Sequence, residues 1–495
     1  MPVKSDSLLV GLSMGTTKTI MIVAKRDRNY PDSIHVIGFG DAASRGISKG
    51  IIVSVPEAQQ SVMEALKKAQ GMTGINPKEL SNVMVAFNAW DVRSESTHGM
   101  ITLGGRDSKS DAVARDDLDR VIERARDESE LKINMYPLHL IPTSYELDGR
   151  PVDEPLSMNG TRLDMWLQTV AVPMTYVQTV KACVRKAGLE VKGLILKPLA
   201  SSLGAVYEEE KRAGCISICI GGGTTGIVLF RGGRAFRVLS IPIGGDHIKS
   251  DLATVLHLPL GEADFLKRQL FNPNTNLDEL RNNGIDVDLA TQIVLARIEE
   301  LFSEHIRTAL AECTPQHFPM GVILSGGVSE TPGIEYMLAD ILQLPVRKVE
   351  KPVYPLSYGL DNAAYVSAAG ILKYCVDVER DPYLFMESEN RNRSSRPSQA
   401  GTSGNYDSGS DSGTGSGSYE EFGGNDDDNV KNPRPSKSRD KAVVRESDFY
   451  GDDNVNHNND DYDDDDYYDD EEDDEPRESV REKLGRFLDN LKKIF

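Results

Sequence analysis

Two turns rich in glycine and threonine could bind phosphate. The first turn, SMGTTK, occupies residues 13–18, and the second, GGGTT, occupies residues 221–225. Their backbone N–H groups, the threonine hydroxyls and a lysine ammonium can all contact phosphate oxygens. Each turn alone could be an ordinary hairpin turn in which glycine supplies a positive φ. Together they favour a phosphate site built from two parts of the chain.

Two later segments could complete a nucleotide site. In GVILSGGVSETPGI (residues 321–334), a strand runs into paired glycines, which let a sugar or a ring approach the backbone closely. In GEADFLKRQ (residues 261–269), an aspartate and a lysine three residues apart share one helix face and can reach one ligand. A surface ion pair is the ordinary explanation of that second feature.

The two turns need strands that hold them. The apolar runs that flank the turns are Leu8–Leu12, Ile20–Ala24, Cys215–Ile220 and Ile227–Phe230. A strand at 34–39 and an amphipathic helix at 56–70 follow the first hairpin, which is typical of a mixed α/β domain. Two such hairpins about two hundred residues apart predict a duplicated fold with a cleft between its halves.

Residues 83–165 have a different pattern, which predicts an inserted subdomain. Strand-like segments there accompany an amphipathic helix expected at Arg115–Glu130. The side chains expected to face inward are Leu118, Val121, Ile122 and Ala125.

The cysteines and the apolar runs limit the compartment. Five cysteines occur among 495 residues, without a CxxC pair. Cys215 and Cys219 could be half of a zinc site, but no second Cys/His pair follows, and small core residues are the ordinary explanation. The N-terminus lacks the apolar core of a signal peptide, and no run approaches the roughly 18–20 apolar residues of a spanning helix. We therefore expect a cytoplasmic protein, soluble or peripheral to a membrane.

A long segment before the C-terminus is acidic and of low complexity. Residues 391–480 contain 26 acidic and 10 basic residues, so they carry −16 of the net charge of −21. Such a segment cannot bury enough apolar area to offset its ordering entropy, so 386–478 is expected to be a disordered linker. A plain solvated spacer is its ordinary function, and binding of a basic partner is the alternative.

Residues 479–495 are expected to form an amphipathic helix. The positions of its apolar stripe are Val480, Leu484, Phe487, Leu488, Leu491, Ile494 and Phe495. Residues 481–495 carry five basic and two acidic side chains, which suits an anionic membrane surface. Docking on the protein's own core or in a partner's groove is the alternative. The acidic segment beside the helix disfavours nucleic acid as a partner.

With these features in this order, the sequence resembles the actin, heat-shock chaperone and sugar kinase superfamily, and within it the FtsA family of bacterial cell-division proteins. The supporting stretches, over about residues 7–375, are VGLSMGTTKT, IGFGDAASRGISKGIIV, LHLIPTSYELDG, LKPLASSLGAVY, IGGGTTGIVLF, IPIGGDHIKSDLA, GVILSGGVSETPGI and AAYVSAAGILKY. The segments SRGISKG and PLASSLGAVY are more specific than any glycine turn.

The resemblance implies an actin-like, duplicated α/β fold with ATP in the cleft between two core domains. The implied segments are 1–83 and 166–196 for the first core domain, 84–165 for an inserted SHS2 subdomain, 197–375 for the second core domain, about 230–310 for its smaller subdomain, and 361–375 for a helix that packs back on the first domain.

The resemblance also assigns ATP contacts. The implied phosphate contacts are Gly15, Thr16, Thr17, Lys18, Gly221, Gly222, Gly223 and Thr224, and the implied ribose and adenine contacts are Asp264, Lys267, Gly326 and Gly327. The superfamily usually has acids where this chain has Ser13 and Cys219, and Glu or another polar residue where it has Lys197. A hydroxyl, a thiol and an ammonium cannot replace carboxylates as magnesium ligands. ATP hydrolysis is therefore expected to be weak or absent, and we hypothesise that Lys197 partly replaces the metal cation.

The implied function is a peripheral adaptor that binds ATP, polymerises like actin and tethers the FtsZ ring to the cytoplasmic face of the inner membrane at the division septum. Its smaller subdomain would bind the C-terminal peptide of FtsZ, with Glu300, Glu304 and Arg307 as candidate contacts. A small-molecule kinase or active ATPase of the superfamily is the competing class, although the turns offer no carboxylate base. A pilus- or secretion-associated adaptor of the same fold is a third possibility.

Overall fold

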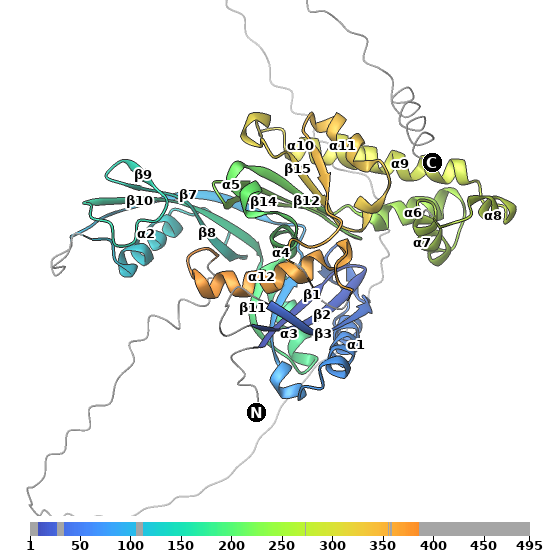
Figure 1. The fold of residues 1–495 in the computed structure, drawn as a ribbon, viewed down its shortest axis with the longest axis horizontal. Coiled ribbons are helices and arrows are strands. Elements are labelled where there is room, and N and C mark those ends of the chain that lie inside the picture. Colours follow the sequence, from blue (N-terminus) through green and yellow to red (C-terminus); the bar gives the residue numbers. More distant parts are fainter. Residues whose placement is uncertain are drawn as a thin grey trace, which may run out of the picture. The chain divides into compact units, whose positions relative to one another are not determined.

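The computed structural model describes residues 8–26, 34–104, 112–272, 274–354, 356 and 359–385. The predicted acidic linker and amphipathic helix, 386–478 and 479–495, lie outside these residues. The described chain builds three sheets of four or five strands and a two-stranded sheet, with helices packed on them (Figure 1).

The first sheet has the strand order β11–β6–β1–β2–β3. Its strands are β1 (Leu8–Met14), β2 (Lys18–Arg26), β3 (Ile34–Ala43), β6 (Asn82–Phe87) and β11 (Glu190–Leu196). The strands β1, β2 and β3 are antiparallel, whereas β6 pairs in parallel with β1 and with β11. The helices α1 (Val55–Thr73) and α3 (Met174–Lys186) pack on this sheet, as does α12 (Val366–Arg380), and the three together bury it (Figure 1). Short elements between them are β4 (Ile47–Ser48), β5 (Ile51–Ile52) and η2 (Pro77–Leu80).

The second sheet repeats this arrangement strand for strand. Its order is β14–β13–β12–β15–β16, and its strands are β12 (Cys215–Ile220), β13 (Thr225–Arg231), β14 (Arg234–Ile241), β15 (Val322–Ser325) and β16 (Val346–Lys348). The first three strands are antiparallel, and β15 pairs in parallel with β12 and with β16. The duplication that two hairpins indicated is therefore confirmed and extends to five strands.

The third sheet, β7–β10–β8–β9, carries one helix. Its elements are β7 (Arg93–Thr102), α2 (Arg115–Asp127), β8 (Met135–Leu147), β9 (Arg150–Val152) and β10 (Arg162–Pro173). The helix buries Leu118, Val121, Ile122 and Ala125 in a separate apolar cluster with the sheet, which confirms the predicted inward face.

The expected borders of the inserted subdomain fall inside strands. Residue 84 lies in β6, which belongs to the first sheet, and residue 165 lies in β10, which belongs entirely to the third. Both strands are apolar runs in the sequence, and only their hydrogen-bond partners decide which sheet each joins. The expected start of the smaller subdomain, residue 230, likewise lies inside β13.

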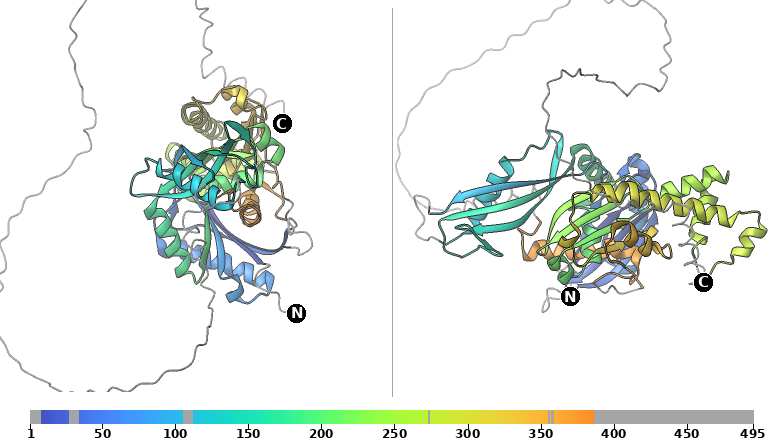
Figure 2. Two further views of the ribbon diagram at one scale, coloured as in Figure 1. Left: turned by 90° about the vertical axis from the view of Figure 1, so that its left-hand side faces the viewer. Right: turned by 90° about the horizontal axis from the view of Figure 1, so that it is seen from above.

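Helices of the second half share the apolar cluster of the second sheet, and those in yellow-green extend beyond the edge of the sheet (Figure 2). They are α6 (Gly245–Val255), α7 (Leu260–Gln269), α8 (Leu277–Asn282), α9 (Val287–Glu300), the π-helical η3 (Leu301–Ile306), α10 (Arg307–Ala309), η4 (Pro315–His317), η5 (Gly327–Glu330) and α11 (Ile334–Leu342). The expected helix around 298–310 is thus the end of a longer helical segment that contains a π-helical turn.

Two helices in close contact join the halves. The helix α4 (Lys197–Ala205), followed by α5 (Glu208–Ala213), packs against both the first and the second sheet, and α12, preceded by η6 (Ala363–Tyr365), crosses α4. A Cβ on Gly370 would lie 2.7 Å from the carbonyl carbon of Ala200, and a Cβ on Gly204 would lie 3.0 Å from the backbone N of Gly370. Glycine at both positions therefore permits the close crossing. None of the helices in the described part of the chain is both long and apolar enough to cross a bilayer.

Candidate functional site

The two glycine turns face each other at close range and together line a cavity of about 560 Å³. This volume lies within the roughly 300–1,000 Å³ of small-molecule sites. A Cβ on Gly223 would lie 2.6 Å from the Thr16 hydroxyl, so the turns approach as closely as glycine allows. The predicted residues that line the cavity are Gly15, Thr16, Thr17, Lys18, Gly221, Gly222, Lys267 and Gly327.

A second, narrower pocket adjoins the cavity at the base of the turns and is lined by Thr224 and Cys219 among others. Asn88 donates from Nδ2 to the Thr224 hydroxyl at 2.5 Å, and the Gly50 N–H donates to the Thr16 hydroxyl at 3.1 Å. These bonds hold both hydroxyls in place. Sequence reasoning missed Asn88. This residue follows the end of β6, far along the chain from both turns, so its spacing gave no sign that it contacts the site.

The N-terminus of α6 fixes the second turn. The N–H groups of Gly245 and Asp246 donate to the carbonyl oxygens of Gly221 and Gly222, at 3.0 and 2.6 Å. Gly244 precedes the helix, and a Cβ on Gly244 would lie 2.7 Å from the Gly222 carbonyl oxygen. The second turn can therefore pack closely against α6 only because the stretch IPIGGDH has glycine at 244.

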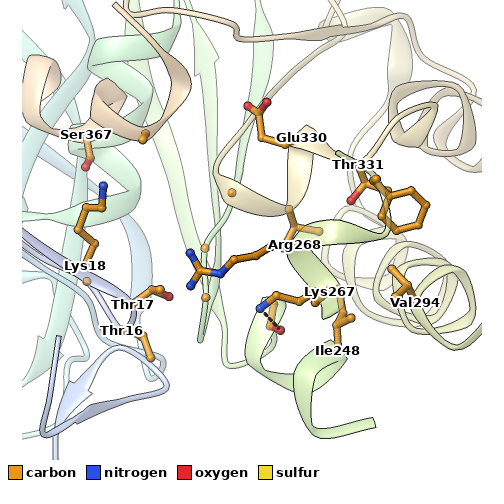
Figure 3. A pocket seen from close by; sticks show the side chains of 18 of the residues that line it. Thr16, Thr17, Lys18, Ile248, Lys267, Arg268, Val294, Glu330, Thr331 and Ser367 are labelled. Carbon is orange, nitrogen blue, oxygen red and sulfur yellow. Dashed lines mark hydrogen bonds between the residues drawn. The ribbon is translucent and has the colours of Figure 1, made fainter. Parts of the chain in front are cut away.

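Four cationic side chains line the cavity: Lys18, Lys197, Lys267 and Arg268. Figure 3 shows Lys267 and Arg268 extending from α7 toward the first turn. Asp264 lies behind both and accepts from Lys267 at 2.8 Å and from Arg268 at 2.7 Å. Burial alone would raise the pKa of Asp264, but these hydrogen bonds outweigh it, and the pKa falls below its usual value. Asp264 thus holds cations toward the cavity and does not line it.

The turn after β15 supplies another wall. Gly326 has φ +97°, and a Cβ there would lie 2.7 Å from the carbonyl carbon of Ile220, so this position requires glycine. Gly326 shapes the turn, while Gly327 lines the cavity. Apolar side chains that could contact a flat ring complete the lining, and sequence reasoning missed them: Ile248, Phe271, Val294 and Val328. Glu330, Thr331 and Ser367, also missed, line the cavity as well (Figure 3).

Three residues that the sequence singled out as departures, Ser13, Cys219 and Lys197, do not suit a magnesium ion. The buried Ser13 hydroxyl lies 3.1 Å from the hydroxyl of Ser367. Cys219 presents a soft thiol, and Lys197 presents an ammonium, whereas magnesium requires hard oxygen ligands. In the described residues, no group of three or more His, Cys, Asp or Glu side chains is arranged to hold a metal. Cys215, the other cysteine of the zinc hypothesis, begins the same strand, β12, and is buried in the core.

The remaining predicted residues lie away from the cavity. Glu300, Glu304 and Arg307 are all exposed on α9, η3 and α10, and Glu300 accepts a 2.8 Å hydrogen bond from Arg297. The apolar residues proposed for the membrane, 480–495, fall outside the described residues.

Two family models match the chain. The one described as "Cell division protein FtsA" matches residues 217–370, and the one described as "SHS2 domain inserted in FTSA" matches residues 90–171. The second match covers most of the third sheet and its helix.

Curated relatives agree with the family models. The cell division protein FtsA of Agrobacterium fabrum is 30% identical over 398 residues, which cover 75% of this chain and 87% of that protein. The FtsA of Pseudomonas aeruginosa is 29% identical over 396 residues, covering 77% of this chain and 92% of that protein. The FtsA of Bacillus subtilis is 29% identical, covering 75% and 84%.

Among solved structures, the chain is similar to a PilM–PilN type IV pilus biogenesis complex. The TM-score is 0.54 with 18% identity, and the match covers 74% of this chain and 98% of that chain. This likeness concerns the fold, which is actin-like as the sequence predicted, and fold alone does not assign function. The sequence matches distinguish between the protein families considered above, because they extend over most of each relative. This chain belongs to the FtsA family of cell division proteins.

Proposed function

We propose that the protein binds ATP in the cavity, assembles with copies of itself and holds FtsZ filaments on an anionic membrane. The observation that carries this proposal is the cavity, where two phosphate-type turns from the two halves of an FtsA-family fold face each other. Backbone N–H groups and cations around one space are what a polyphosphate requires.

The lining divides into a polar and an apolar part, as a nucleotide would need. Thr16, Thr17 and Lys18 approach from the first sheet, and Gly221 and Gly222 approach from the second. The apolar residues of α6, α7 and α9 are available to the base. ATP turnover would be slow, because neither turn offers a carboxylate to position a metal ion or a water. The resemblance implies that such acids usually occupy the positions of Ser13 and Cys219.

The C-terminal segment supports membrane attachment through its sequence. Its apolar stripe and net positive charge suit the interface of an anionic bilayer, where apolar side chains enter and cations contact headgroups. One short helix binds weakly, but several helices on one polymer bind together through their raised effective concentration. Self-association and membrane binding therefore strengthen each other.

The helical region of the second half is the proposed site for the C-terminal peptide of FtsZ. It exposes the charged side chains Glu300, Glu304 and Arg307 together with apolar ones, including Leu260 and Phe265, both 59% exposed. A region that exposes both apolar and charged side chains is suited to an amphipathic peptide.

Co-sedimentation of the full chain with anionic vesicles tests the proposal, with and without ATP and an FtsZ C-terminal peptide. The wild type should pellet with vesicles and carry the peptide with it, and ATP should increase both. Phe487→Glu with Leu491→Glu should abolish pelleting, because two carboxylates would enter the apolar stripe. Gly485→Glu with Asn490→Glu adds the same charge outside the stripe and should retain more binding than the stripe variant.

Three results would contradict the proposal. Equal loss in both double variants would mean that charge alone, and not the stripe, governs binding. Pelleting that is unaffected by the stripe variant would place the anchor elsewhere. ATP turnover above about 1 per second, in the range of kinases, would favour the enzyme alternative.

A further inference from the structure

We propose that Lys197 takes the place of the divalent cation, so that this chain binds the polyphosphate of ATP without magnesium. The inference rests on the proposed nucleotide function of the cavity and concerns the cofactor that the same site needs.

Lys197 lies beside both glycine turns. It is the first residue of α4, and its side chain lines both the large cavity and the narrow pocket at the base of the turns. Its ammonium is the nearest group to the position that a Cβ on Gly15 would take, so it lies directly against the first turn. The second turn lines the same two pockets through Gly221 and Gly222.

Lys197 differs from the other cations of the cavity in lacking a carboxylate partner. Lys18 pairs with Asp41 at 3.1 Å, and Lys267 and Arg268 both pair with Asp264. Within the described residues, Lys197 has no ion pair and no hydrogen bond from its ammonium. Its positive charge is therefore the one left for a ligand to neutralise.

The surroundings of Lys197 favour an incoming anion. The ammonium sits at the N-terminus of a nine-residue helix whose first turn contains no acidic residue, and a helix N-terminus is itself electropositive. Burial lowers the pKa of Lys197, and the neighbouring Cys219 sulfur opposes this only in part. A bound polyphosphate would offset the repulsion between the ammonium and the positive end of α4, and it would accept hydrogen bonds from the ammonium.

The same surroundings oppose magnesium. A divalent cation at this place would meet the Lys197 ammonium and the positive end of α4, and neither Ser13 nor Cys219 supplies a hard anionic ligand. An ammonium held by the chain can neutralise phosphate charge while it is protonated, whereas a metal would have to be recruited. The lack of acids at Ser13 and Cys219 and the presence of Lys197 therefore have one joint effect, which is to exchange a metal ion for an ammonium.

Isothermal titration of the full chain with ATP, in excess EDTA and in excess magnesium, tests the inference. The wild-type dissociation constant should differ by less than about threefold between the two conditions. In EDTA, Lys197→Gln should weaken binding by roughly 10- to 100-fold, the range for hydrogen bonds to charged groups. Lys197→Arg should retain most of the affinity. Lys192→Gln removes a neighbouring lysine that pairs with Glu379 outside the cavity, and it should match the wild type.

The outcomes separate this inference from the proposed function. A wild type that binds ATP tightly only with magnesium overturns the inference and leaves the nucleotide site intact. A wild type that binds ATP in neither condition overturns the proposed function. The inference is also overturned if Lys197→Gln binds ATP in EDTA as tightly as Lys192→Gln does. If Lys197→Gln does not fold, the comparison of the wild type in EDTA and in magnesium still tests the inference.

Discussion

His139 should make the stability of the fold fall steeply as the solution becomes mildly acidic. Its imidazole is fully buried on β8, and burial lowers its pKa from 6.5 to about 3. The Leu196 N–H donates to Nε2 at 3.1 Å, while Nδ1 has no partner in the described part of the chain. Leu196 ends β11 and precedes Lys197, so this bond joins the third sheet to the start of α4.

The sign of the effect follows from the two pKa values. Below pH 6.5 the unfolded chain binds a proton at this histidine, but the folded chain does not until about pH 3. The stability is therefore complete above pH 6.5 and is lost as the pH falls toward 3. Each pH unit costs about 1.4 kcal/mol, so about 2 kcal/mol should be lost by pH 5.

Urea unfolding at pH 7.5 and pH 5.0, followed by tryptophan fluorescence, measures this loss. Trp166 on β10 reports on the third sheet. His139→Gln keeps an acceptor for the Leu196 N–H but cannot titrate, so it should lose about 2 kcal/mol less than the wild type between these pH values. The exposed His257→Gln should behave as the wild type. Equal losses in the wild type and in His139→Gln would refute the reasoning, because all other titrating groups are shared.

Two glycine substitutions test the packing around the site. Gly244→Ala should displace the second turn from α6 and weaken ATP binding by roughly tenfold, as measured by calorimetry. A Cβ on Gly261 would have no neighbour within 4 Å, so Gly261→Ala should bind ATP as the wild type does. Equal affinities of the two variants would contradict the role of Gly244 in packing that turn against α6. Gly370→Ala should lower the free energy of unfolding by about 1–3 kcal/mol, because a Cβ would overlap Ala200 of α4. Gly71→Ala, with open space around it in α1, should not lower it, and similar urea midpoints for the two would count against the α4–α12 contact.

Much of the site could be predicted because glycine turns after apolar strands are local patterns. The turns at 13–18 and 221–225 form where the sequence indicated, since hydrophobic runs and glycine determine hairpins within a few residues. The pairing of Asp264 with Lys267 is also local, because residues three apart share a helix face. The spacing could not show that Asp264 binds Lys267 and Arg268, and that these two cations, and not Asp264, line the cavity.

Other residues of the site come together only through long-range contacts. Asn88 reaches Thr224 across 136 positions of sequence, and Ser367 reaches Ser13 across 354. No periodicity connects residues so far apart, since their proximity depends on how whole elements pack. The sequence could not assign β6 and β10 to their sheets for the same reason, because both are apolar runs that differ in the strand each pairs with.

The sequence by itself determined the duplicated α/β pattern, the two turns rich in glycine and threonine and the absence of an acidic residue from those turns, because side-chain chemistry and local periodicity are written along the chain. Only the tertiary structure decided which charges remain uncompensated. Lys18, Lys267 and Arg268 pair with carboxylates, whereas Lys197 has no such partner among the described residues. That distinction arises from where α4, the two turns and α7 meet in space, since the interaction of charges depends on their distance and burial and not on their order along the chain.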